Sequence, residues 1–275
     1  KSDEFSAYQE LETALTEGGD RWVRYVEANS ATEVDEESVE PSAAEKDEIP
    51  TDEAATKAAA LRTKAQAYSE KNDYAHAVLV YTQALEADPQ SAESFAGRAL
   101  AKAGLNDIEG AAGDISRALK LDRNCAAAYG ARSIIKLALA DPNGAITDAS
   151  RAIELAPTNP RNYMTRGLAY EKLKDYRAAI LDYTVAVDLN PQDDRVYLYR
   201  GLALLKSNQD QEAIADFDKA ISMDANDGIA YLNRGAAKEN LGDLTGALDD
   251  YREALRLNPQ DTSARQGLDR LKAKQ

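Results

Sequence analysis

Few side chains in this sequence could carry out catalytic chemistry. The 275 residues include one cysteine, Cys125, and one histidine, His76. A single imidazole excludes a metal site that needs two histidines, and a single thiol excludes an intramolecular disulfide. Neither residue has a base or a metal ligand beside it in the sequence, so we expect both to be ordinary surface residues. The phosphate-binding glycine motifs are absent from the sequence. We therefore predict no enzymatic activity, no metal and no cofactor.

Charged side chains nevertheless recur at a fixed spacing. Arginine occupies one position every 34 residues, and an aspartate follows each arginine after sixteen residues. An arginine stripe that binds anions is the alternative interpretation, but a carboxylate at every matching position favours structural ion pairs. The predicted pairs are Arg98–Asp114, Arg132–Asp148, Arg166–Asp182, Arg200–Asp216 and Arg234–Asp250.

Pairs of helices must position these charges. Within each 34-residue period, apolar residues recur twice at helical spacing, with a short turn between the two runs. In the fourth period Tyr163, Gly167 and Tyr170 mark the first helix, and Ala179 and Tyr183 mark the second. Small residues at matched positions would let two helix backbones approach closely. The pattern predicts an all-α chain of helical hairpins.

The pattern resembles the tetratricopeptide repeat, a 34-residue hairpin with small and aromatic residues at fixed positions. The resemblance covers six consecutive units over 58–261, and it implies a right-handed superhelical solenoid. We expect 262–275 to form a C-terminal capping helix, because an uncovered terminal repeat exposes apolar surface. Three lysines replace a residue that is usually aromatic, and we expect weaker local packing there: Lys102, Lys136 and Lys238.

In this family the first helices of the hairpins line the concave side, where partner peptides usually bind. The corresponding positions here give an apolar groove floor and a basic rim, a surface that suits aliphatic anchors flanked by carboxylates. Alternatively, some of these side chains only pack against neighbouring first helices. The floor consists of Met164, Leu168, Leu198, Tyr199, Leu202 and Leu232, and the rim of Arg161, Lys172, Arg195 and Lys206.

Some chaperone-linked members of the family hold a C-terminal carboxylate in a clamp of Lys, Asn and Arg side chains. The places that the clamp requires hold Gly97, Ala127 and Ala131 in this sequence. We therefore do not expect this chain to bind the C-terminal tail of a chaperone.

The first 57 residues differ in composition from the repeats, with 17 acidic and 5 basic side chains. Within 1–29, helical spacing of four apolar residues predicts an amphipathic segment, and the acidic stretch 30–57 predicts a linker. Two arrangements stay open: the segment packs on the first repeat, or it occupies the groove of its own or a neighbouring chain. The four apolar residues are Phe5, Tyr8, Leu11 and Leu15.

The net charge of -15 disfavours binding to nucleic acid or to an anionic membrane surface. We expect a soluble, non-enzymatic protein–protein interaction module or assembly scaffold. The alternative is an accessory or regulatory subunit of a larger complex, docked through its acidic N-terminal extension with the solenoid as a rigid spacer. The first residue is Lys1, so the sequence leaves open whether the protein is cytoplasmic or exported after removal of a leader.

Overall fold

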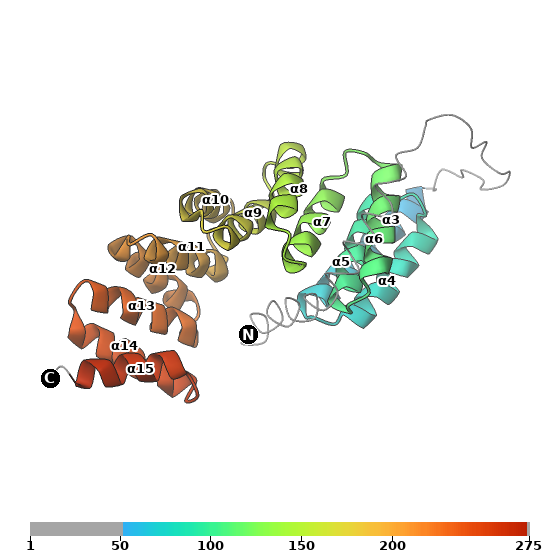
Figure 1. The fold of residues 1–275 in the computed structure, drawn as a ribbon. Coiled ribbons are helices and arrows are strands. Elements are labelled where there is room, and N and C mark those ends of the chain that lie inside the picture. Colours follow the sequence, from blue (N-terminus) through green and yellow to red (C-terminus); the bar gives the residue numbers. More distant parts are fainter. Residues whose placement is uncertain (1–51, 274–275) are drawn as a thin grey trace. The chain divides into compact units, whose positions relative to one another are not determined.

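Thirteen α-helices make up residues 52–273, the part of the chain that the computed structural model describes (Figure 1). The predicted amphipathic segment 1–29 and residues 30–51 of the predicted linker lie outside it. The chain divides into two compact units, Lys1–Leu155 and Ala156–Gln275. Every regular element in the described residues is helical, as the sequence pattern predicts.

The first unit contains three helical hairpins. Its first helix begins at Asp52, so it includes 52–57, which the sequence analysis assigned to the linker. The acidic residues Asp52 and Glu53 favour a helix start here because they complement the positive end of the helix dipole. The hairpins are α3 (Asp52–Glu70) with α4 (Tyr74–Ala87), α5 (Ala92–Gly104) with α6 (Ile108–Leu121), and α7 (Ala126–Ala138) with α8 (Pro142–Leu155).

The second unit contains three further hairpins and one additional helix. The additional helix, α15 (Thr262–Lys272), packs against the last hairpin and lies where the capping helix was predicted. The hairpins are α9 (Pro160–Lys172) with α10 (Tyr176–Leu189), α11 (Asp194–Lys206) with α12 (Asp210–Met223), and α13 (Gly228–Asn240) with α14 (Leu244–Leu257).

The turn inside every hairpin uses one residue in the left-handed conformation. Asparagine and glycine adopt this conformation at low cost, whereas alanine and lysine do so with strain. An aspartate follows in five of the six turns and caps the second helix, and Gln209 replaces it before α12 without a side-chain cap. The left-handed residues are Asn72, Asn106, Ala140, Lys174, Asn208 and Gly242.

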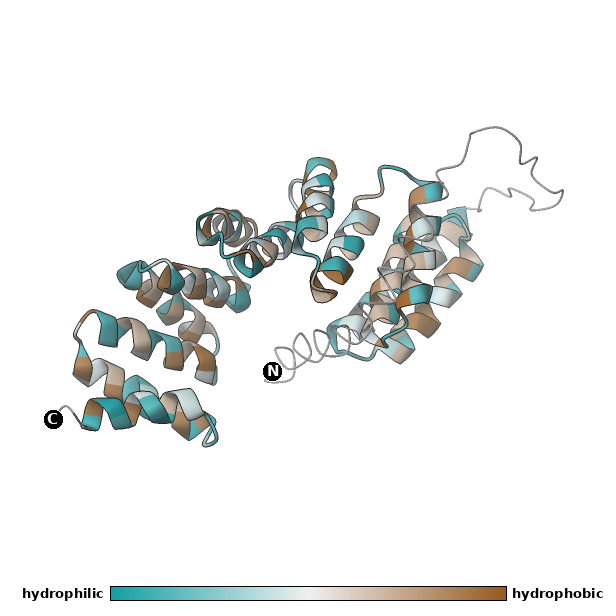
Figure 2. Ribbon diagram, viewed as in Figure 1, coloured by the Kyte–Doolittle hydropathy of each residue, from teal (hydrophilic) through white to brown (hydrophobic). Residues whose placement is uncertain are grey.

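The core of each unit consists mainly of alanine, with a few aromatic rings between the helices. Tyr183 and Phe217 are fully buried. A Cβ added to Gly167 would lie 2.6 Å from the Tyr183 ring, so only glycine permits this approach of α9 and α10. Hydrophilic and hydrophobic residues alternate along the helices (Figure 2). The amphipathic pattern thus buries one side of each helix and leaves the other to solvent.

Candidate functional site

Five arginine–aspartate pairs hold the two helices of their hairpins together. In each pair the arginine Nε and Nη2 atoms donate to the two carboxylate oxygens, at 2.6–2.9 Å. The aspartates are only 2–6% exposed. This bidentate geometry satisfies both charges in a largely dry site. The pairs are those derived from the sequence spacing, from Arg98–Asp114 to Arg234–Asp250.

The same arginines also contact groups that the sequence analysis did not include. Each guanidinium lies over the aromatic ring three residues earlier, at 5.2–5.9 Å from the ring centre. Three of them also donate from Nη1 to a side chain of the preceding hairpin: Arg98 to Thr82, Arg200 to Thr184 and Arg234 to Asp218. These three arginines therefore join successive hairpins as well as the helices of one hairpin.

The lysines that replace an aromatic residue form a second set of ion pairs. Lys102 lies 2.8 Å from the Asp114 carboxylate and Lys136 lies 2.9 Å from Asp148. Lys238 contacts Asp250 in the same way, at 2.8 Å. These positions were expected to pack more weakly because they lack an aromatic residue. The ion pairs are a contact that the family pattern of aromatic residues does not predict.

The first helices of the second unit form one continuous inner layer. Helix α11 contacts both α9 and α13, and α13 contacts α15. The predicted groove floor lies on these helices, but its residues differ in exposure. Met164 and Leu198 are 8% and 6% exposed and belong to the core, so they offer little surface to a partner. The half-buried floor residues are Leu168, Tyr199, Leu202 and Leu232.

Tyr199 is the aromatic residue of the predicted groove floor. Its ring stacks on that of Tyr183, with the centroids 6.1 Å apart. Burial raises the pKa of the Tyr199 hydroxyl, so the side chain stays neutral at physiological pH. A neutral ring held by a second ring provides a preorganised contact for an apolar side chain.

The predicted rim is partly neutralised by carboxylates. Lys206 donates to Glu171 at 3.1 Å and lies 5.8 Å from the centre of the Tyr176 ring. Arg195 forms a bidentate pair with Asp193 at 2.8 Å. The other two rim residues, Arg161 and Lys172, are exposed. Glu171 and Asp193 thus add carboxylates beside the predicted cations, and the inner face is less basic than predicted.

Glu171 on α9 also holds a buried tyrosine of α10 in place. It accepts a hydrogen bond from the buried Tyr183 hydroxyl at 2.7 Å. The last hairpin repeats the arrangement, since Glu239 accepts from Tyr251 at 2.9 Å and is paired with Arg270 of the capping helix. Burial, followed by the nearby Glu239 carboxylate, raises the pKa of Tyr251. These hydrogen bonds fix the positions of Tyr183 on α10 and Tyr251 on α14.

Cys125 is not the surface residue that was expected. It is 4% exposed, precedes α7 and packs in the core of the first unit, where burial raises the pKa of the thiol. Cysteine behaves as a small apolar residue and is frequently buried, which the turn position alone did not reveal. His76 is exposed, as expected, and its Nδ1 atom lies 2.8 Å from the Asp73 carboxylate.

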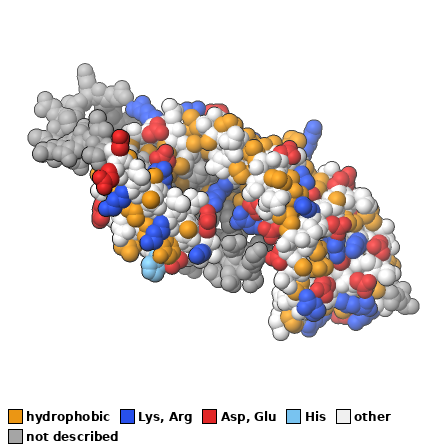
Figure 3. Space-filling view, turned by 180° about the vertical axis from the view of Figure 1, so that it is seen from behind, with side chains coloured by type: hydrophobic (Ala, Val, Ile, Leu, Met, Phe, Trp, Pro, Cys, Tyr) orange, Lys and Arg blue, Asp and Glu red, His pale blue; other side chains and the backbone are white. Residues whose placement is uncertain are grey.

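The outer face of α10 exposes an apolar stripe that the sequence analysis did not identify. Leu181, Val185 and Leu189 are 64%, 36% and 37% exposed and are spaced four residues apart on one side of the helix. The preceding and following hairpins of the chain have arginine or lysine at the position of Val185. Charged and apolar side chains also intermingle over the face shown in Figure 3.

Two negative findings apply to the described residues, 52–273. No group of three or more histidine, cysteine, aspartate or glutamate side chains there could hold a metal ion. Within the same residues, none of the helices combines the length and the apolar character that crossing a membrane requires.

Comparison with known proteins identifies the repeat. The model of the tetratricopeptide repeat matches residues 58–91, and the model described as the ETO1 C-terminal domain matches residues 111–274. No curated protein matches the chain. The fold and the repeats therefore define a tetratricopeptide repeat protein, with six hairpins and a cap, in a class whose fold serves protein–protein interaction. More particularly, the chain belongs to the ETO1 C-terminal domain family.

Solved structures show the same fold. Pseudomonas aeruginosa PilF has a TM-score of 0.67 at 18% identity, over 81% of this chain and 100% of PilF. YrrB, described as a tetratricopeptide protein with an unusual peptide-binding site, has a TM-score of 0.58 at 22% identity, over 68% of this chain and 96% of YrrB. MamA has a TM-score of 0.54 at 25% identity, over 58% of this chain and 93% of MamA.

Proposed function

We propose that this chain is a non-enzymatic protein–protein interaction module or assembly scaffold. Its inner face on α9, α11 and α13 binds an apolar segment of a partner protein that is flanked by acidic residues. The observation that carries the proposal is the set of half-buried apolar side chains on adjacent first helices: Leu168, Tyr199, Leu202 and Leu232.

The packing of these residues supports a preformed site. Each contacts a core cluster on one side and keeps surface on the other, so binding requires little reordering of the side chains. Burying the remaining apolar surface under a partner yields about 25 cal/mol per Å². Rigid helices and the Tyr199–Tyr183 stack keep this surface in place.

The charged residues support the acidic flanks of the ligand. Arg161 and Lys172 are exposed at the two ends of α9. Lys206 pairs with Glu171, whose side chain is 11% exposed, but the lysine side chain is itself 50% exposed and keeps contact with solvent. A partner carboxylate can therefore compete for Lys206. Existing carboxylates at the rim would in turn disfavour ligands that are acidic along their whole length.

The proposal predicts that a substitution on the inner face weakens peptide binding and that a matched one on the outer face does not. The probe is a labelled peptide with two leucines between pairs of glutamates, titrated into the full chain by fluorescence anisotropy. Leu202→Glu should raise Kd tenfold or more, about 1.4 kcal/mol, because the new carboxylate meets both leucines and glutamates.

Leu181→Glu is the matched control, since it makes the same change on the outer stripe of α10. It should leave Kd within twofold of the parent chain, and helical circular dichroism checks that both variants are folded. Equal losses in the two variants, or a peptide that binds as well with serines in place of its leucines, would contradict an apolar site on the inner face.

A further inference from the structure

The two ends of the repeat array differ in the described residues. At the C-terminal end, α15 packs on α14 and contacts α13. At the other end, no described helix precedes α3, so the face that a preceding hairpin would cover is open. The equivalent faces of α5, α7, α11 and α13 each contact the second helix of the preceding hairpin.

Two alanines of α3 depart from the burial pattern of their equivalents. Ala60 and Ala67 are exposed. The residues that occupy these two positions in α5, α7, α11 and α13 are at most 1% exposed, and so are the matching residues of α15. They are Ser94, Ala128, Val196, Ala230 and Ala264 for Ala60, and Ala101, Ile135, Ala203, Ala237 and Leu271 for Ala67. The backbone of α3 therefore presents a packing surface that everywhere else in this comparison is covered.

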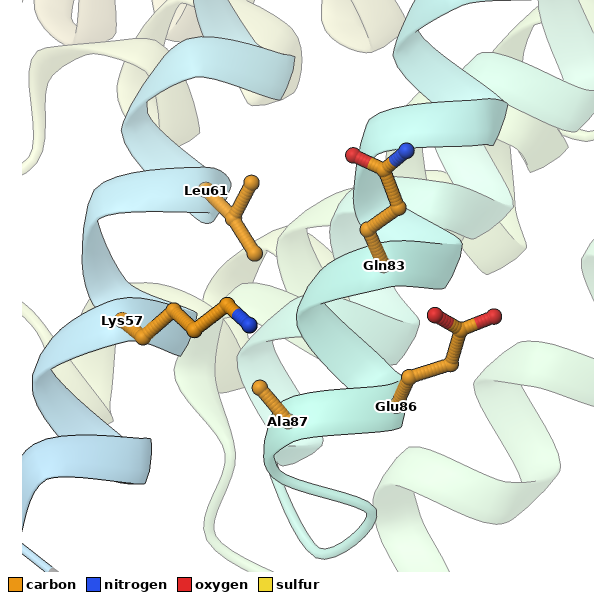
Figure 4. A pocket seen from close by; sticks show the side chains of 5 residues that line it. All are labelled: Lys57, Leu61, Gln83, Glu86 and Ala87. Atoms are coloured by element: carbon orange, nitrogen blue, oxygen red, sulfur yellow. The ribbon is translucent and has the colours of Figure 1, made fainter.

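The open face combines small residues with basic ones. Lys57 and Lys64 are exposed and share one side of α3 with Ala60 and Ala67, and the exposed Lys71 follows directly after the helix. A cleft of about 340 Å³ adjoins it between α3 and α4 (Figure 4). The side chains of Lys57 and Leu61 line the cleft from α3, opposite Gln83, Glu86 and Ala87 of α4.

Two contacts elsewhere in the repeat array show which side chains pack on such a surface. The ring of Tyr81 on α4 packs on Gly97 of the following helix. At the opposite end, a Cβ added to Gly267 of α15 would lie 2.6 Å from the ring of Tyr251 on α14. Thr63 of α3 occupies the position of Gly97 and Gly267 and lies between Ala60 and Ala67. The matching ligand is therefore a helix that places an aromatic ring on these small residues.

We propose that the N-terminal segment Phe5–Leu15 of the same chain docks on the open face of α3 and caps the first hairpin. Its helical spacing puts the aromatic residues Phe5 and Tyr8 on one side with Leu11 and Leu15, which fits the small residues of α3. Residues 1–51 carry 15 acidic and 4 basic side chains, which complements the three exposed lysines.

The length of the chain permits this contact. Helix α3 has 19 residues and is therefore about 28 Å long. Residues 16–51 join Leu15 to α3, and a chain of that length can span about 120 Å at most. The connection thus reaches any point of the open face. Docking within one chain also gains the effective concentration of a tethered ligand, on the order of mM.

Hydrogen exchange of the full chain tests the proposal. Replacing Phe5 and Tyr8 with serine should increase exchange of the α3 amides about tenfold or more, because the helix loses its cover. Replacing Gln9 and Thr13 with serine, on the other side of the segment, should leave α3 unchanged. Exchange in α10 and α12 verifies that the array itself is intact in both variants.

A second experiment changes α3 instead of the N-terminal segment. Ala67→Glu places a carboxylate among the three lysines and should remove protection from the amides of residues 5–15, whereas Ala55→Glu, elsewhere on the exposed surface of α3, should not. Unchanged α3 exchange in the Phe5 and Tyr8 variant would overturn the proposal. Loss of protection in α9, α11 and α13 instead, or protection that depends on protein concentration, would also overturn it in favour of the groove or a second copy.

Discussion

At the scale of single residues, the recurring arginine makes more contacts than its ion pair with aspartate. Arg98 contacts Asp114 on its own hairpin, Thr82 on the preceding hairpin and the ring of Phe95. The sequence spacing predicted the aspartate. It did not predict the threonine or the ring contact, because these depend on how successive hairpins pack and not on one hairpin alone.

This difference leads to a prediction for two matched aspartates. Among the described residues, Asp114 compensates Arg98 and Lys102, whereas Asp216 is paired with Arg200 alone. Asp114→Asn should lower the free energy of unfolding by about 3–5 kcal/mol, since two cations lose their partner. Asp216→Asn should cost less, about 1.5–3 kcal/mol. Urea unfolding of both variants measures the difference, and equal losses would show that the lysine does not belong to the network.

Asp227 leads to a prediction of pH dependence. Desolvation by burial raises the pKa of this carboxyl group, although it caps α13 by accepting from the amides of Ile229 and Ala230. Its ionised form therefore costs stability at neutral pH, and the cost disappears as pH falls below the ordinary aspartate pKa of about 4. Asp227→Asn keeps the cap and should raise Tm at pH 7. A gain in Tm that persists unchanged at pH 3 would show that charge is not the cause.

At the scale of the elements, the hairpin turns combine a left-handed residue with a helix cap. Asparagine and aspartate in the sequence mark most of these turns, so the turns and the helix spacing could be predicted. The start of α3 could not, because helix and linker compositions overlap where Asp52 and Glu53 precede several alanines. The burial of Cys125 depends on the packing of α7, which a single position in a turn does not specify.

The missing cap of α12 provides the prediction at this scale. Gln209 occupies the cap position but makes no side-chain hydrogen bond to the helix amides. Gln209→Asp should stabilise the second unit by about 1 kcal/mol, as expected for a capping side chain. Gln209→Ala is the control and should be nearly neutral. The prediction fails if the thermal midpoints of the two variants coincide.

At the scale of the whole molecule, the period of 34 residues made the helical class, the six hairpins and the cap predictable. The composition of the inner face was predictable only in part. Apolar spacing placed Met164 and Leu198 on the first helices, but packing buries both of them. The rim was predicted to be basic from its lysines and arginines, but Glu171 and Asp193 contribute carboxylates to the same surface. Exposure and charge balance depend on neighbouring helices, which local spacing does not describe.

The central claim is that the inner face of α9, α11 and α13 binds an apolar, acid-flanked protein segment. The most direct measurement is photo-cross-linking of the full chain with the leucine–glutamate peptide carrying a photoreactive group between its leucines, followed by mass spectrometry of the adducts. Our account predicts adducts on the inner helices, near Leu168, Tyr199 and Leu202, that excess unlabelled peptide removes. Competable adducts concentrated on the outer stripe of α10 would contradict it.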